Sequence, residues 1–256
     1  MKVKDLAAHA QRLKGGGLNA DEGVLHGDPE TEVEGVLLTW MATVPALEAA
    51  AREGCNVVLC HELFYLHAQG TSLAPQHLAS APNRARLRAA AAGDITLLRL
   101  HGTLDMICLY DDFAAALGFE NPTPRSGWHK VFPIPETTVA ELVERVKSSL
   151  GLPQVRVAGD LAKRVSCVGL PWGGLGLDSN IGYTHQLIEM GADVFVAGEA
   201  DEYGFTFAND AGVPMIETGH SVSENIGIKH FAQMLRDEFP GLRTVYFDDT
   251  RAFRIV

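Results

Sequence analysis

The sequence predicts an α/β fold, and three observations support that class. Short apolar runs that are typical of buried strands alternate with amphipathic stretches of helical periodicity. An apolar run at residues 33–40, an alanine-rich helix at 44–53 and a strand at 56–60 follow one another, which is the strand–helix–strand unit of a parallel sheet. The third observation is that a similar unit recurs in the second half of the chain.

The expected elements on either side of this unit continue the alternation. An amphipathic helix is expected at residues 5–14, where three consecutive glycines end it. Turn residues and then an Ala/Arg-rich helix follow the first unit, and we interpret residues 63–100 as an insertion. The later expected elements are a strand at 95–100, a helix ending near 117, a helix at 138–150, strands near 155 and at 165–170, a helix at 179–190, a strand at 194–197 and a helix at 225–237.

The two halves of the chain resemble each other in sequence pattern. Residues 54–62 (GCNVVLCHE) match residues 191–199 (GADVFVAGE). Any two strand–helix–strand units share some of this pattern, but a second coincidence favours an internal duplication. Each half contains a histidine followed at the fourth position by a carboxylate, namely His101 with Asp105 and His220 with Glu224.

The length of 256 residues allows one large domain or two medium ones, and the repeat favours two related halves. We expect a first α/β half at residues 1–125, which carries the insertion, and a second at 126–256. The most linker-like stretch, residues 121–128, lies at this border.

The charge and the apolar pattern exclude several classes of partner. The chain has 21 Lys and Arg against 32 Asp and Glu, a formal net charge of −11, which argues against nucleic-acid binding. Residues 63–104 nevertheless carry four Arg and one Asp, so a small anionic substrate is compatible with the sequence. No apolar run approaches the roughly 18 residues of a membrane span, and the four cysteines form no CxxC pair. We expect a cytoplasmic protein with no membrane partner.

Three motifs predict a metal site because they combine nitrogen and oxygen donors. Cys60, His61 and Glu62 follow a buried strand, where open α/β sheets usually place their chemistry. A histidine and a carboxylate four residues apart share one helix face and can point at one ion. Imidazole with carboxylate suits Zn, Mn or Fe better than Ca. A single such pair is more often a helix surface pair, so the prediction depends on the ordered set.

In this order the motifs resemble those of the Nif-three-like family (NGG-interacting-factor-three homologues), some members of which are named GTP cyclohydrolase I type 2. The family has a His-His motif after an early strand, a His-x-x-x-Asp motif, a Gly-Glu pair after a late strand and a terminal Gly-His-x-x-x-Glu motif. The matching residues are Cys60 and His61, His101 and Asp105, Gly198 and Glu199, and Gly219, His220 and Glu224.

The resemblance implies two intertwined α/β halves with mixed sheets, a dinuclear metal centre between them and a toroidal homohexamer. It implies two divalent transition metals per chain, with Zn, Fe or Mn as the candidates. The implied ligands are His61, Asp105, His220 and Glu224, with His101 at or beside the metals.

The chain departs from the family pattern at Cys60, which stands where the family has the first histidine of the pair. Three interpretations follow. Cys60 could bind as a thiolate and favour softer metals. Alternatively, Cys60 is a small buried hydrophobe and Glu62 supplies an oxygen instead. The third interpretation is a site that holds one metal. Cys60 stays among the candidate ligands.

Two bound metals predict a hydrolase, because they activate water and polarise a substrate. We expect it to act on a nucleotide or phosphoester-type small molecule, with Glu62 and Glu199 as candidate acid/base residues and His101 as a further one. The alternative is a non-catalytic metal-binding ring or scaffold protein. A weaker hypothesis places a nucleotide on the glycine-rich segment 173–176. The segment lacks the GxGxxG and GKS/T forms, so a tight strand-to-helix turn explains these glycines better.

Overall fold

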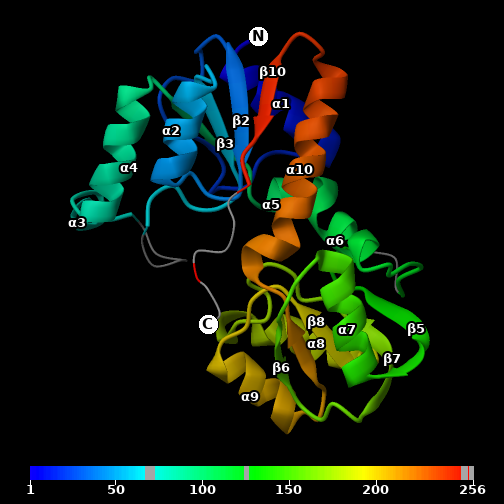
Figure 1. The fold of residues 1–256 in the computed structure, drawn as a ribbon. Coiled ribbons are helices and arrows are strands. Elements are labelled where there is room, and N and C mark those ends of the chain that lie inside the picture. The colour runs from blue at the N-terminus through cyan, green and yellow to red at the C-terminus, as the bar shows by residue number, and fades with distance from the viewer. Residues whose placement is uncertain (67–72, 124–126, 249–252, 254–256) are drawn as a thin grey trace. The chain divides into compact units, whose positions relative to one another are not determined.

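The computed structural model describes residues 1–66, 73–123, 127–248 and 253. It confirms the mixed α/β class, because the chain forms two five-stranded sheets that each mix parallel and antiparallel pairs (Figure 1). The described chain divides into two compact units. Unit 1 comprises residues 1–108 and 227–248, and unit 2 comprises residues 109–226.

The sheet of unit 1 has the strand order β1-β4-β3-β2-β10. The four strands β4, β3, β2 and β10 are parallel, and β1 is an antiparallel edge strand. Every residue of β2, β3 and β4 is buried, as expected for parallel strands that are covered on both faces. The bounds are β1 Gly23–His26, β2 Gly35–Thr39, β3 Val57–Cys60, β4 Thr96–Arg99 and β10 Arg243–Tyr246.

The helices of unit 1 cover this sheet, and α2 and α4 lie together on one side of it (Figure 1). Leu47 of α2 and Ala90 of α4 enter one buried cluster with Leu37 and Val58 of the sheet. The helices are α1 (Val3–Lys14), α2 (Val44–Arg52), α3 (Pro75–Leu78), α4 (Ala81–Ala92) and α5 (Gly102–Leu104), followed by a π-helix at Asp105–Leu109. The long helix α10 (His220–Glu238) begins in unit 2 and ends in unit 1.

The sheet of unit 2 has the order β5-β7-β8-β9-β6, in which β7, β8 and β9 are parallel and both edge strands are antiparallel. Its strands are β5 (Val131–Thr138), β6 (Arg156–Ala158), β7 (Arg164–Gly169), β8 (Val194–Ala197) and β9 (Met215–Glu217). Its helices are α6 (Tyr110–Ala116), α7 (Val139–Leu150), a 3₁₀ turn (Asp178–Asn180), α8 (Ile181–Glu189) and α9 (Glu202–Asp210).

The topologies of the two units correspond over four strands, whereas the fifth is parallel in unit 1 (β10) and antiparallel in unit 2 (β5). In each unit a parallel trio has the same order, with β3 or β8 at its centre and β4 or β9 beside it. An antiparallel strand then pairs with β4 or β9 from the outer side, β1 in unit 1 and β6 in unit 2. The sequence motifs therefore lie at the ends of equivalent strands. The CHE motif begins with the last residue of β3, the Gly-Glu pair follows β8, and the two His-x-x-x-carboxylate motifs follow β4 and β9.

Several elements differ from the sequence prediction. The helix predicted at 225–237 begins at His220, so it includes the second His-x-x-x-carboxylate motif. The edge strands β1 and β5 were not predicted. β1 is short and only partly buried, and β5 contains Pro133 and Pro135, which edge strands tolerate. Within the described residues, no helix combines the length and the apolar character needed to cross a membrane.

The predicted halves at 1–125 and 126–256 divide the sequence by internal similarity and stay a prediction. The compact units divide the chain by packing, and the C-terminal strand β10 pairs with β2 of the first sheet. The expected insertion at 63–100 contains α3, α4 and β4, and its residues 67–72 lie outside the described part of the chain.

Candidate metal site

His61 is completely buried directly after β3. Its backbone N–H donates to the Trp40 carbonyl at 3.1 Å, and its ring Nδ1 lies 3.2 Å from the Leu100 carbonyl. Because a carbonyl can only accept, this hydrogen bond requires a proton on Nδ1 and gives Nε2 the lone pair that a metal ligand needs. Nε2 lies 4.0 Å from Asp105 Oδ1.

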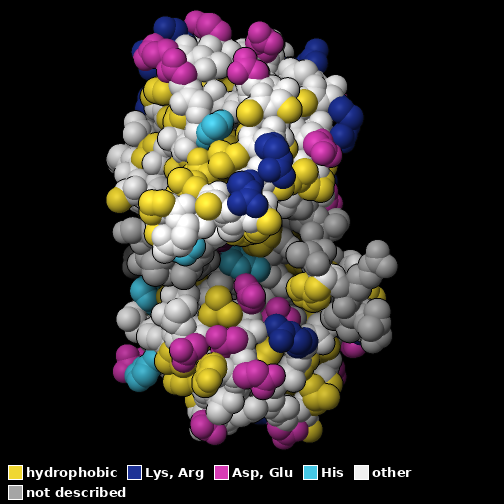
Figure 2. Space-filling model, turned by 90° about the vertical axis from the view of Figure 1, so that its left-hand side faces the viewer, with side chains coloured by type: hydrophobic (Ala, Val, Ile, Leu, Met, Phe, Trp, Pro, Cys, Tyr) yellow, Lys and Arg dark blue, Asp and Glu magenta, His cyan; other side chains and the backbone are white. Residues whose placement is uncertain are grey.

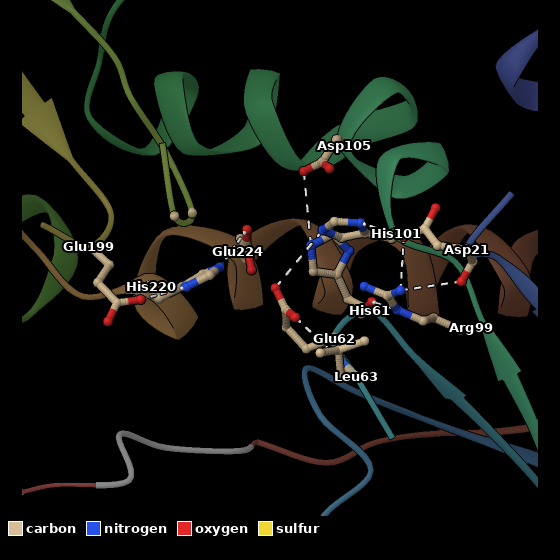
Figure 3. Close-up of polar contacts among 12 residues, drawn as sticks. Asp21, His61, Glu62, Leu63, Arg99, His101, Asp105, Glu199, His220 and Glu224 are labelled. Carbon is tan, nitrogen blue, oxygen red and sulfur yellow. Dashed lines mark hydrogen bonds and ion pairs between the residues drawn. The ribbon is translucent and has the colours of Figure 1, made fainter. Parts of the chain in front are cut away.

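Glu62 and His101 complete a donor group with His61 in unit 1. One donor atom from each of the three side chains lies within 4.8 Å of the others (Figure 3). Glu62 is only 3% exposed, and its Oε1 lies 3.9 Å from His101 Nε2. The ring centroids of His61 and His101 are 4.8 Å apart. Two imidazoles and a carboxylate therefore converge, with Asp105 beside them.

Asp105 opens the π-helix that follows α5. A π-helical turn carries an extra residue per hydrogen-bonded ring and is frequent at functional sites. The Asp105 side chain is 11% exposed and faces His61 (Figure 3). His101 precedes α5 and Asp105 follows it, so this motif takes the loop-to-helix form, and it is His61 that Asp105 approaches.

Asp21 contacts the other ring nitrogen of His101, and it belongs to none of the sequence motifs. Its Oδ2 lies 3.1 Å from His101 Nδ1 and accepts from Arg99 Nη1 at 2.8 Å. Arg99 is buried and also donates from Nε to the His61 carbonyl at 3.0 Å. Burial acts to raise the pKa of Asp21, but Arg99 and His101 outweigh it and hold that pKa below its ordinary value.

Glu22 fixes the start of α5. Its carboxylate accepts from the backbone N–H of Thr103 at 2.7 Å and from the Thr103 hydroxyl at 2.6 Å. Asp21 and Glu22 lie in the polar stretch before β1, about 80 residues from their partners in the sequence. The available signal was two adjacent acids directly before a short glycine-bounded apolar run, GVLH.

In unit 2, His220 and Glu224 form the second donor group at the start of α10. His220 Nε2 lies 3.3 Å from Glu224 Oε1, so the two residues share one helix face as predicted. Glu199, which follows β8, approaches the other ring nitrogen, and its Oε2 lies 2.9 Å from His220 Nδ1 (Figure 3). Glu224 is 3% exposed. The imidazole is thus held between two carboxylates.

The glycine-rich turn after β7 packs directly against this pair. Gly173 has φ +53°, and a Cβ on it would overlap Glu224 Oε1. Its backbone N–H donates to the Ser223 hydroxyl at 2.9 Å, and a Cβ on Gly198 would overlap both Gly173 and Ser223. The glycines therefore allow close backbone approach. Because the Gly173 N–H is used inside unit 2, the geometry favours the tight-turn interpretation over a phosphate cradle.

Cys60 lies in the hydrophobic core of unit 1 and not with the donors. Its side chain packs in the cluster that contains Leu37 and Val58, and burial raises the pKa of its thiol to about 12. No donor group found in the described residues includes Cys60. This placement argues against the predicted Cys60 ligand and favours the interpretation in which Glu62 supplies an oxygen.

The arginines of the basic segment are mostly committed to contacts within unit 1. Arg86 is buried and donates to the carbonyls of Leu63 and Phe64, and Arg84 donates to the Ala79 carbonyl. Arg99 binds Asp21 as described. Acidic side chains are spread over the part of the surface that unit 2 forms in the lower half of Figure 2. An anion site on Arg84 and Arg88, which lie four residues apart, stays a weak prediction, because Arg84 already donates to a backbone carbonyl.

The donor chemistry fits a divalent transition metal. Zn, Fe and Mn accept imidazole nitrogen together with carboxylate oxygen, and both donor groups combine these two atom types. Ligands roughly 2 Å from one ion lie about 3–4 Å from each other, close to the 3.3 Å, 3.9 Å and 4.0 Å separations found here.

Known proteins resemble this chain over almost its whole length. A GTP cyclohydrolase 1 type 2 homolog from Chlamydia trachomatis is 25% identical over 237 residues, which cover 89% of this chain and 88% of the relative. A protein of the same name from Chlamydia pneumoniae is 24% identical in an alignment that covers 99% of this chain and 100% of the relative.

A solved structure has the same fold. It is the crystal structure of a Bacillus cereus protein related to NIF3, which superposes with a TM-score of 0.80 at 16% identity and covers 100% of this chain and 99% of that one. The family model for Duf34/NIF3 matches residues 2–251. This chain therefore belongs to the Duf34/NIF3 (NGG1p interacting factor 3) family.

Proposed function

We propose that this protein is a metal-dependent hydrolase that acts on a nucleotide or phosphoester-type small molecule. The observation that carries the proposal is the arrangement of two histidines, His101 and His220. Each has Nδ1 held by one carboxylate and Nε2 turned towards another, which is how proteins prepare an imidazole for a metal. The name of the relatives, GTP cyclohydrolase 1 type 2 homolog, supports a purine nucleotide as one substrate to test.

The proposed cofactors are two divalent transition-metal ions per chain, of Zn, Fe or Mn, in the dinuclear centre expected from the sequence. Bound metals lower the pKa of coordinated water and polarise a substrate. The proposed ligands are His61, Glu62, His101 and Asp105 of unit 1 and His220 and Glu224 of unit 2.

The chain's own residues orient these donors. The Leu100 carbonyl and Asp21 hold the Nδ1 atoms of His61 and His101. Glu199 does the same for His220, so we assign it to positioning, although the sequence suggested acid/base catalysis. Glu62 is assigned as an oxygen donor, because its Oε1 faces the His101 ring from a buried position.

Glu62→Gln separates the two roles predicted for Glu62. The amide keeps the shape of the side chain but is a weaker ligand and no base. If Glu62 is a metal ligand, the Glu62→Gln variant should contain less metal than the parent protein. A variant that keeps full metal content while turnover falls more than about 100-fold assigns acid/base catalysis to Glu62 instead.

The experiment that tests the proposed function measures the metal content of the purified protein by elemental analysis and then turnover on a panel of nucleotides and phosphoesters. We expect two metals per chain and hydrolysis that chelation abolishes. Two metals per chain without turnover on any member of the panel favours the non-catalytic metal-binding or scaffold alternative. Nucleotide binding that survives chelation favours a regulator.

A further inference from the structure

The internal repeat places Glu62 and Glu199 at matching positions, but the two carboxylates have different partners. Each lies two residues after the central strand of its sheet, β3 or β8. Glu199 Oε2 meets His220 at Nδ1, 2.9 Å away. Glu62 Oε1 instead faces Nε2 of His101, at 3.9 Å. Glu62 therefore does not contact Nδ1 of His101, and a carboxylate at that atom comes from another part of unit 1.

Asp21 supplies that carboxylate from the segment before β1. This edge strand pairs with β4, and β4 leads directly to His101. Asp21 Oδ2 lies 3.1 Å from His101 Nδ1. Because a carboxylate can only accept, the contact fixes the proton on Nδ1 and the lone pair on Nε2. The His101 side chain is 38% exposed, so without this contact water would leave the tautomer free to change.

Arg99 connects Asp21 to the other histidine of the donor group. The buried guanidinium donates from Nη1 to the Asp21 carboxylate at 2.8 Å and to its backbone carbonyl at 3.2 Å. From Nε it donates to the His61 carbonyl at 3.0 Å. The Arg99 side chain thus holds both the His61 backbone carbonyl and the Asp21 carboxylate that contacts His101.

From these contacts we propose that Asp21 is a positioning residue that holds His101 in the tautomer with Nε2 as the donor atom, and that it does in unit 1 what Glu199 does in unit 2. The role of Asp21 deepens the proposed function, because it defines how His101 enters the metal site. Both units therefore place a carboxylate at Nδ1 of the motif histidine, but the carboxylate comes from a different position in each unit.

A purely structural role for Asp21 makes a different prediction, and Glu22 provides the comparison. Glu22 anchors the same loop through Thr103 without touching an imidazole. Loosening the loop at Glu22 therefore leaves the His101 ring contact in place, whereas removing the Asp21 carboxylate abolishes it. The comparison is Asp21→Ala with Glu22→Gln.

The direct readout is the histidine tautomer in the metal-free protein, measured by long-range ¹H–¹⁵N NMR of the imidazole rings at a pH where they are neutral. We expect Nδ1–H at His101 in the parent protein and in Glu22→Gln, and Nε2–H in Asp21→Ala. An unchanged tautomer in Asp21→Ala overturns the proposal. If Asp21→Ala does not fold, Asp21→Asn replaces it and is judged on metal affinity.

The second readout is the affinity of the metal-free protein for Zn²⁺ and Co²⁺ by titration calorimetry. Loss of an outer-shell partner weakens metal binding by roughly 10–100-fold. We expect that loss for one bound metal in Asp21→Ala or Asp21→Asn, and less than about a threefold change in Glu22→Gln. Equal losses in the Asp21 and Glu22 variants contradict the proposal. A parent protein that binds no metal but shows Nδ1–H at His101 refutes the proposed function and leaves the tautomer assignment standing.

Discussion

His220 Nδ1 lies 2.9 Å from Glu199 Oε2. Glu199, which the sequence suggested as an acid/base residue, thus contacts the ring nitrogen of His220 that faces away from the candidate metal position. Glu199 is nevertheless 43% exposed, whereas His220 is 15% exposed, so the carboxylate contacts both the largely buried imidazole and solvent. Because Glu199 contacts His220, the role of Glu199 is tested by its effect on metal binding at His220.

Glu199→Gln should weaken metal binding while leaving the fold intact. The amide loses the charge that stabilises the Nδ1–H tautomer, and the expected loss of Zn²⁺ affinity is roughly 10–100-fold. Titration calorimetry on the metal-free variant measures it. Glu202→Gln, at an exposed neighbouring site, is the control and should bind as the parent does. Parental affinity in Glu199→Gln together with lost turnover would restore the acid/base assignment.

Gly173→Ala should damage the second donor group. The new Cβ would overlap Glu224 Oε1, and φ of +53° is unfavourable for alanine. We expect a loss of about 1–3 kcal/mol in the free energy of unfolding together with lower metal content. The matched control is Gly182→Ala, in the exposed first turn of α8, where a Cβ meets nothing within 4 Å. Urea unfolding compares them, and equal stability of the two variants would argue against the close packing.

Cys60→Ala should retain the parental metal content. The thiol packs in the apolar cluster of unit 1, so its removal leaves a small cavity that costs about 1–2 kcal/mol of stability. Elemental analysis of the purified variant checks the first point and urea unfolding the second. Loss of a metal in a variant that remains folded would instead assign Cys60 as a ligand.

The free energy of unfolding should fall in mild acid because of the buried His9. It is 6% exposed, and its ring packs edge-on against Phe239 with centroids 5.1 Å apart. Burial lowers the pKa of His9, and Arg12 lowers it further against an opposing effect of Glu238. Since the folded-state pKa lies below the unfolded value, this contribution to stability is complete above the unfolded pKa and is lost as the pH falls below it.

The measurement for His9 is urea unfolding at pH 7.5 and pH 5. His9→Gln cannot bind the proton, so it should lose less stability between the two pH values than the parent does. His185→Gln, at an exposed position on α8, should lose as much as the parent. An identical pH dependence in His9→Gln and the parent would exclude His9 as a source of acid sensitivity.

The sequence was sufficient for the donors that lie on local motifs. His220 and Glu224 share a helix face because of their spacing, and His61 follows a strand that its apolar run identifies. Asp21 could not be found in this way, because its contact with His101 depends on the pairing of β1 with β4. Such pairing is long-range, and β1 has too little apolar content to indicate it.

The position of Cys60 shows a second limit. Side chains alternate between the two faces of a strand, so the face that a residue takes depends on which neighbours the sheet packs against. The apolar run predicts β3, but only the packing of α2 and α4 against it shows that Cys60 enters the core. The helix α10 begins at His220, and Glu199 and the Gly173 turn contact residues of its first turn.

The most direct test of metal binding compares two His-x-x-x-Glu pairs in unit 2. His220 and Glu224 are largely buried, whereas His185 and Glu189 form an exposed pair with the same spacing on α8, 3.8 Å apart. We predict two metals per chain in the parent protein and in His185→Ala, and at most one in His220→Ala. Equal metal content in His220→Ala and His185→Ala, or no metal in the parent protein, would contradict the account.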